Sequence, residues 1–144
     1  MENLNSSLLE PIITPRFALS CSEGLMTKLG DLAKSNNLAI QTHISENRGE
    51  MQIVKDLFPR CKDYLEVYEN HNLIGNRTLL AHGIHLSDDE LSRMCNVGAS
   101  VVHCPTSNTN LMSGFFDAKE MISFFFFNFQ KISLNLNSSI LQLS

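Results

Sequence analysis

Short strand-like runs alternate with helical runs from Arg16 to Cys104, and this alternation constrains the fold more than any other feature of the chain. Strands that alternate with helices are typical of βα units and a parallel sheet. The predicted fold class is therefore α/β. The four strand-like runs are Arg16 to Leu19, Leu38 to Ile44, Thr78 to His82 and Ala99 to Cys104.

Capping signals and apolar periodicity predict the helices between these strands. Ser20 with Glu23, and Ser87 with Glu90, have the spacing of a capping box, which marks a helix start. The predicted helices run from Ser20 to Asn37, from Asn47 to Phe58, roughly from Tyr64 to Leu73, and from Ser87 to about Gly98. We expect Pro105 to Asn110 to be loop.

Composition and charge exclude several classes of protein. The 144 residues fit one domain. With 43% hydrophobic and 18% charged residues, the composition is neither that of a disordered protein nor that of a fibrous one. The net charge of −4 and the scattered Lys and Arg residues argue against a nucleic-acid binder, so small molecules or other proteins are the expected partners. No signal peptide is visible, and four widely spaced cysteines indicate reduced thiols in an intracellular protein.

The last stretch of the chain differs from the rest in kind. Phe124 to Phe127 are four consecutive phenylalanines, and Phe129 to Ser144 uses few residue types. The run around Phe124 is far too short for a membrane-spanning helix, which needs about 20 apolar residues. We interpret this stretch as a non-native ending and an aggregation hazard, with an ordinary buried strand as the alternative.

Three of the five histidines, His43, His82 and His103, each end a strand-like run. Active sites of parallel sheets form at the C-terminal ends of the strands. Because side chains alternate along a strand, Gln41 and His43 share one face, as do Leu80 and His82. Neutral imidazole is also the commonest nitrogen ligand for zinc. The pattern therefore favours a converging metal site.

Glu46 follows His43 by three residues, and the residues around Ser45 suggest that the chain turns there. A carboxylate beside a metal-bound water is suited to shuttle a proton from that water to a leaving group. Taken alone, a strand-end histidine is more often structural, and Glu46 would be a solvated acid at a helix start. The combination of His43, Glu46 and His82 favours the functional interpretation.

The remaining histidines and the known zinc motifs give no further support for a metal site. His71 and His85 lie in helix-end and loop contexts and are assigned no role. His103 and Cys104 could form a metal pair, although a buried strand cysteine is the better interpretation. The zincin pattern H-E-x-x-H is absent, and Cys104 lacks the second cysteine that a cytidine-deaminase site needs.

Four short segments together carry a resemblance to a known family. They are Pro15-Arg16-Phe17, Thr42 to Asn47, Ala81-His82-Gly83 and His103 to Asn108. On these segments, the chain from about Pro15 to Gly114 resembles the guanine deaminase family of the metal-dependent amidohydrolase superfamily. H-I-S-E-N and A-H-G belong to the wider superfamily, and P-R-F with H-I-S-E-N narrows the resemblance to guanine deaminases.

The resemblance implies a fold, a reaction and a set of site residues. The fold would be the central part of a (β/α)8 TIM-type barrel, about strands four to seven. The reaction would be hydrolytic deamination of guanine to xanthine and ammonia in cytoplasmic purine catabolism, by a homodimeric zinc enzyme. His43 would bind zinc, Glu46 would shuttle the proton and His82 would orient the attacking water. Arg16 would hydrogen-bond the purine and Phe17 would contact its ring, with His43 and Glu46 also facing the substrate.

The chain also departs from the family pattern. It contains neither the H-x-H pair of the first barrel strand nor the T-D pair of the eighth, both of which supply zinc ligands. A family barrel needs about 250 residues, and catalytic zinc ordinarily has three protein ligands. We therefore expect an incomplete barrel that is inactive alone, with an N-terminal stub (1–14), a partial amidohydrolase barrel (15–117) and a divergent low-complexity hydrophobic tail (118–144).

Two alternatives stay open at this point. The chain could be a non-catalytic truncated product that binds the full-length enzyme. It could also belong to a related amidohydrolase that acts on another aminopurine, a pterin or a triazine.

Overall fold

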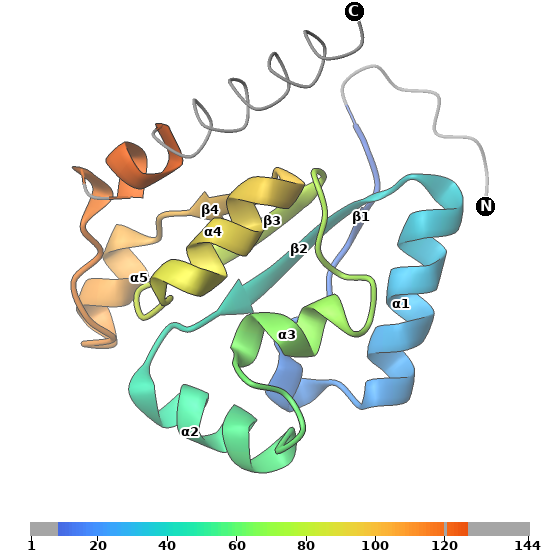
Figure 1. The fold of residues 1–144 in the computed structure, drawn as a ribbon, viewed down its shortest axis with the longest axis horizontal. Coiled ribbons are helices and arrows are strands. Elements are labelled where there is room, and N and C mark those ends of the chain that lie inside the picture. The colour runs from blue at the N-terminus through green and yellow to red at the C-terminus, as the bar shows by residue number, and fades with distance from the viewer. Residues whose placement is uncertain (1–8, 120, 127–144) are drawn as a thin grey trace, which may run out of the picture.

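A four-stranded parallel sheet forms the centre of the computed structural model, which describes residues 9–119 and 121–126 (Figure 1). The strand order follows the sequence, and the parallel α/β fold is confirmed. Ile44 at the end of β2 lies opposite His82 at the end of β3. The strands are β1 (Ile12–Ile13), β2 (Ala39–Ile44), β3 (Thr78–His82) and β4 (Ser100–Val102).

The connections between the strands are helical. They comprise the short 3-10 helix η1 (Ala18–Ser20), α1 (Glu23–Asn36), α2 (Arg48–Leu57), α3 (Tyr64–Glu69), α4 (Asp88–Val97) and, after β4, α5 (Pro105–Asn110). The predicted capping box is present at the start of α4, where the Ser87 hydroxyl accepts from the Glu90 N–H and the Glu90 carboxylate accepts from the Ser87 N–H. Gly98 ends this helix with a left-handed φ of 76°.

One face of the sheet forms the hydrophobic core, and the helices cover it. The core side chains of the strands are Ile40, Ile44 and Leu80, and those of the helices include Met26 and Ala33 of α1, Tyr68 of α3 and Met94 of α4. The opposite face is more exposed, with Leu79 39% and Val102 39% accessible. In the expected barrel this face would be the inner one, and β2 and β3 present their alternate side chains to it.

The predicted strand at Arg16 to Leu19 is wrong, as is the helix start at Ser20. The first strand lies earlier, at Ile12–Ile13, and Ala18 begins a 3-10 turn. The buried Ala18 donates its N–H to the Tyr68 hydroxyl (3.0 Å), a side-chain contact that replaces a strand partner. The N-cap of α1 is Ser22, whose hydroxyl accepts from the Leu25 N–H.

Residues 105–110 are a helix rather than the predicted loop. Pro105 occupies the first helical turn, where its missing N–H costs nothing. Asn108 is buried and bonded to His82, so a tertiary contact stabilises a segment whose polar composition favours a turn. Cys104 is a half-buried N-cap residue rather than a buried strand residue.

Part of the predicted tail lies within the described residues. Residues 121–126 are helical there, so the buried-strand alternative is wrong for this part. Residues 1–8 and 127–144 lie outside the described residues, and the division into stub, barrel and tail stays a prediction. Within the described part of the chain, no helix has both the length and the apolar character needed to cross a membrane.

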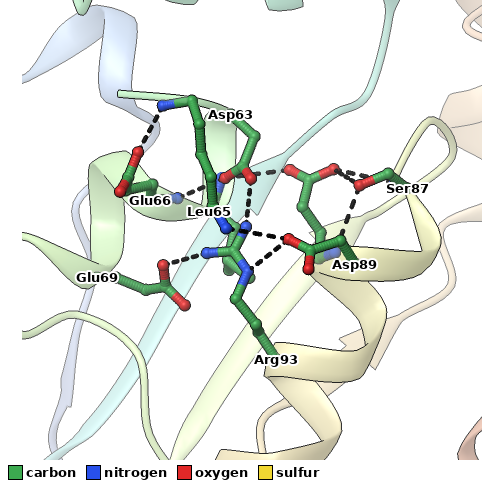
Figure 2. A network of polar contacts seen from close by, with 9 residues as sticks. Asp63, Leu65, Glu66, Glu69, Ser87, Asp89 and Arg93 are labelled. Atoms are coloured by element: carbon green, nitrogen blue, oxygen red, sulfur yellow. Dashed lines mark hydrogen bonds and ion pairs between the residues drawn. The ribbon is translucent and has the colours of Figure 1, made fainter. Parts of the chain in front are cut away.

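An ionic network connects α3 to α4 on the side of the sheet that the helices cover. Figure 2 shows the Arg93 guanidinium of α4 among the carboxylates of Asp63, Glu69 and Asp89. Asp63 is also the N-cap of α3, where its other oxygen accepts from the Glu66 N–H at 2.8 Å. Arg93 therefore holds both ends of α3, from Asp63 to Glu69.

We expect Arg93→Met to lower the free energy of unfolding by about 2 kcal/mol, because hydrogen bonds to charged groups contribute about 1.5–3 kcal/mol each. The Arg93 side chain is 20% exposed, and Asp63 and Glu69 would lose a half-buried partner. Urea denaturation followed by circular dichroism measures the change. Lys62→Met is the matched control, since it removes only the exposed pair with Asp89. Equal losses for the two variants would contradict this assignment.

Candidate active site

His43 is the last but one residue of β2 and lies on the exposed face of the sheet, beside the segment that precedes α1. Its Nδ1 lies 2.6 Å from the carbonyl oxygen of Arg16, which also accepts from the His43 N–H at 3.2 Å. A carbonyl can only accept, so Nδ1 carries a proton, and in the neutral imidazole Nε2 then carries the lone pair. This is the tautomer that a metal ligand or a general base requires.

His82 ends β3, and its backbone departs from the strand there. Strict alternation would place the His82 side chain on the Leu80 face of the sheet, and this side chain is 5% exposed. A positive φ of 72° at His82 breaks this alternation. Its ring stacks on that of His43, with the ring centres 5.3 Å apart. A left-handed conformation in a non-glycine residue is costly and is concentrated at functional sites.

Glu46 reaches the same place by way of a turn. Ser45 has a φ of 48°, which directs the chain back after β2 as predicted. One carboxylate oxygen of Glu46, Oε2, lies 3.6 Å from Nε2 of His82, and the other accepts from the Ser113 hydroxyl at 3.1 Å. The Glu46 side chain is 17% exposed.

Arg16 and Phe17 lie next to this cluster in the chain segment that contacts His43. The exposed guanidinium of Arg16 lies over the Phe17 ring, 5.2 Å from its centre. Two bonds from His43 to the Arg16 carbonyl oxygen, one from its backbone N–H and one from its ring Nδ1, fix the segment against the end of β2. The structure therefore brings together the backbone of Arg16 and the side chains of His43, His82 and Glu46.

Sequence reasoning missed two supporting residues, Asn108 and Ser113. Oδ1 of the buried Asn108 lies 2.7 Å from Nδ1 of His82, so Nδ1 donates and Nε2 is directed at Glu46. Ser113 bonds Glu46 through its hydroxyl, and its carbonyl lies 3.0 Å from Nε2 of His85. Asn108 lies in a segment that carries the family resemblance, but nothing in its spacing indicates a contact with His82.

The other histidines have separate surroundings. His103 is exposed, and its ring stacks on Phe116 at 4.5 Å. Nδ1 of His71 lies 2.8 Å from the Thr27 hydroxyl and ties the end of α3 to α1. The converging strand-end site therefore contains His43 and His82, whereas His103 makes its stacking contact elsewhere.

Comparison with known proteins places the whole arrangement in a family. The sequence profile described as "Amidohydrolase family" matches residues 2–129. The chain belongs to the amidohydrolase family. The human guanine deaminase is 52% identical over 118 residues, which cover 82% of this chain and 26% of that protein. This amidohydrolase chain thus spans about a quarter of the length of the curated relatives that it matches.

Solved structures agree with this assignment and confirm that the fold is part of a TIM-type barrel. The guanine deaminase from C. acetobutylicum, solved with guanine in its active site, has a TM-score of 0.80 and 43% identity. The match covers 83% of this chain and 29% of that one. An adenosine deaminase from Xanthomonas campestris, solved with bound zinc, has a TM-score of 0.71 and 24% identity, and covers 78% of this chain and 25% of that one.

The described part of this amidohydrolase chain does not complete a zinc site. His43 offers one nitrogen, Nε2, because its Nδ1 is engaged by the carbonyl oxygen of Arg16. No group of three or more His, Cys, Asp or Glu side chains among residues 9–119 and 121–126 is placed to hold a metal ion. Catalytic zinc ordinarily needs three protein ligands. A catalytic zinc ion would therefore need further ligands from outside residues 9–119 and 121–126.

Proposed function

We propose that the protein carrying this chain deaminates guanine hydrolytically, with xanthine and ammonia as products. The observation that carries the proposal is the cluster of His43, His82 and Glu46 beside Arg16, in a chain 43% identical to a structure that holds guanine. Water adds its oxygen to the ring carbon, and the bond from that carbon to the amino nitrogen breaks. The amino nitrogen gains one proton, which comes from the water, and leaves as ammonia.

Glu46 is the proposed proton shuttle. Its carboxylate takes a proton from the attacking water and delivers it to the departing amino group. The Ser113 hydroxyl bond to Oε1 leaves Oε2 directed at His82 and available for this exchange. His82, whose Nδ1 proton is engaged by Asn108, presents Nε2 toward Glu46 and orients the water.

We further propose that His43 contributes one ligand to a zinc ion whose other ligands lie outside the described residues. Zinc, when bound, lowers the pKa of a water molecule toward neutrality. The proposal is supported by the His43 tautomer and by the family assignment. We also propose a homodimer, on the family resemblance, and a cytoplasmic location, on the pattern of four widely spaced cysteines.

Arg16 tests the guanine assignment directly. In the longest gene product that contains these residues, referred to below as the complete enzyme, we expect Arg16→Ala to lower kcat/KM for guanine about ten- to a hundredfold, because a charged hydrogen-bond donor to the purine is lost. Xanthine formation measured by ultraviolet absorbance reports the rate. The exposed Arg60 provides the control variant Arg60→Ala, which should behave as wild type. Nearly intact guanine turnover by Arg16→Ala would favour a different aminopurine, a pterin or a triazine.

The second candidate is a non-catalytic role for the chain itself, as a truncated product that binds the full-length enzyme. It is favoured by the lack of a three-residue metal-ligand group within residues 9–119 and 121–126. Xanthine release by the purified chain alone, supplied with zinc, would contradict it. Guanine turnover by the complete enzyme but not by the chain is consistent with both proposals.

A further inference from the structure

Two buried tyrosines of α3, Tyr64 and Tyr68, lie on the core side of the sheet, behind the candidate site. Tyr68 is fully buried and Tyr64 is 4% exposed, and their rings stack with centres 5.4 Å apart. Neither residue belongs to the cluster of His43, His82 and Glu46. The Tyr68 hydroxyl nevertheless bonds directly to the segments that carry the cluster, and the Tyr64 hydroxyl is connected to one of them through Glu50.

The Tyr68 hydroxyl joins the Arg16 segment to the end of β2. It donates to the carbonyl oxygen of His43 at 2.7 Å and accepts from the N–H of Ala18 at 3.0 Å. The Thr42 hydroxyl lies 3.2 Å away and supplies its third contact. A longer contact, of 3.5 Å, joins the Tyr68 hydroxyl to the Tyr64 hydroxyl. Tyr68 thereby fixes the peptide group that follows Phe17 and the peptide group that follows His43.

The Tyr64 hydroxyl acts on the Glu46 turn through one intermediate. It donates to Oε1 of the buried Glu50 at 2.7 Å, and the other oxygen of Glu50 accepts from the backbone N–H of Glu46 at 3.2 Å. Glu50 is in turn held at the start of α2 by Asn47, whose side chain accepts from the Glu50 N–H at 2.9 Å. The turn that carries the proposed proton shuttle is thus tied to α3.

Both hydroxyls stay protonated at neutral pH. Burial raises the pKa of Tyr68 to about 12. Burial also raises the pKa of Tyr64, with further contributions from Tyr68 and Glu50. Each phenol can therefore donate its hydrogen bond throughout the physiological range.

We propose that Tyr68 and Tyr64 are positioning residues that hold the substrate segment, His43 and the Glu46 turn in one geometry from the core side of the sheet. The inference extends the proposed function and depends on it. Tyr68 acts on the substrate segment and on the His43 carbonyl, whereas Tyr64 acts on Glu46 through Glu50. Loss of the Tyr68 hydroxyl should therefore act mainly on KM, and loss of the Tyr64 hydroxyl mainly on kcat.

The test replaces each hydroxyl in the complete enzyme. Misplacement by about 1 Å can cost a hundredfold in rate, so we expect losses of about ten- to a hundredfold in kcat/KM. Tyr68→Phe should act mainly by raising KM for guanine, because the segment of Arg16 and Phe17 is freed. Tyr64→Phe should act mainly by lowering kcat, because the Glu46 turn is freed. Val67→Ala, a 1% exposed position of α3 outside this network, is the control for packing loss.

The outcomes separate a positioning role from a structural one. If both tyrosine variants keep kcat and KM within twofold of wild type, the proposal is overturned. Equal kinetic changes in Val67→Ala would overturn it as well, since they would show a general packing effect. If Tyr68→Phe fails to fold, a lower kcat in Tyr64→Phe confirms that Tyr64 positions Glu46 through Glu50. An unchanged kcat in Tyr64→Phe overturns the proposal.

Hydrogen exchange distinguishes failure of this inference from failure of the proposed function. Tyr68→Phe leaves the Ala18 N–H without its acceptor, so that amide should exchange at least about tenfold faster than in wild type or Val67→Ala. This readout needs no turnover. If the wild-type enzyme does not deaminate guanine, the proposed function fails. Unchanged exchange at Ala18 shows, independently, that Tyr68 does not hold the segment.

Discussion

Glu46→Gln is expected to lower kcat for guanine deamination by the complete enzyme about 10²- to 10⁴-fold, the usual contribution of a general acid–base group. The amide keeps the shape of the side chain and can still accept the Ser113 hydroxyl through its oxygen. It cannot carry a proton between the attacking water and the amino group. KM for guanine should change less than kcat, because the proposed purine contacts of Arg16 and Phe17 are untouched. Steady-state rates of xanthine formation measure both constants.

Glu23→Gln provides the matched control, because Glu23 is an exposed acid in the first turn of α1. Like Glu46→Gln, it removes one negative charge, but outside the cluster of His43, His82 and Glu46. Its kcat and KM should therefore equal those of wild type. Retention of more than a tenth of wild-type kcat by Glu46→Gln would show that another group moves the proton. In that case the contact between Glu46 and His82 would be structural.

Local signals explain why much of the fold is predictable from the sequence. The bounds of β3, Thr78 to His82, agree with the prediction, as does the capping box at Ser87 and Glu90. Strand patterning and helix capping depend on residues a few positions apart, which a single sequence displays. Arg16 to Leu19 fails because its apolar pattern matches a strand while the Ala18 N–H bonds to Tyr68, 50 residues away.

The site is less predictable than the fold for a related reason. The strand ends of His43 and His82 indicate where a site forms, but side-chain alternation alone would direct the His82 side chain to the Leu80 face. A single positive φ at His82 allows the ring to meet that of His43. The partner that orients His82 is Asn108, which is 26 residues away and lies on a helix that composition does not predict.

Gly30→Ala should strongly lower the free energy of unfolding. Gly30 lies within α1, and a Cβ added there would be 1.8 Å from the backbone oxygen of His71, in the turn after α3. Backbone cannot rotate away as a flexible side chain can, so α1 or the turn must move. Overpacking of this kind costs about 3 kcal/mol or more. Urea denaturation should show an earlier midpoint with a similar slope.

Gly24→Ala tests whether the close approach, rather than the loss of a glycine, causes the effect. Gly24 lies in the same helix, and a Cβ at that position meets nothing within 4 Å. Alanine is a better helix former than glycine by up to about 1 kcal/mol, so this variant should be neutral or slightly more stable. An unchanged free energy of unfolding in Gly30→Ala would mean that the space between α1 and the turn at His71 accommodates a methyl group. The bond from Thr27 to His71, at 2.8 Å, would then be the main tie between α1 and the turn that follows Tyr68.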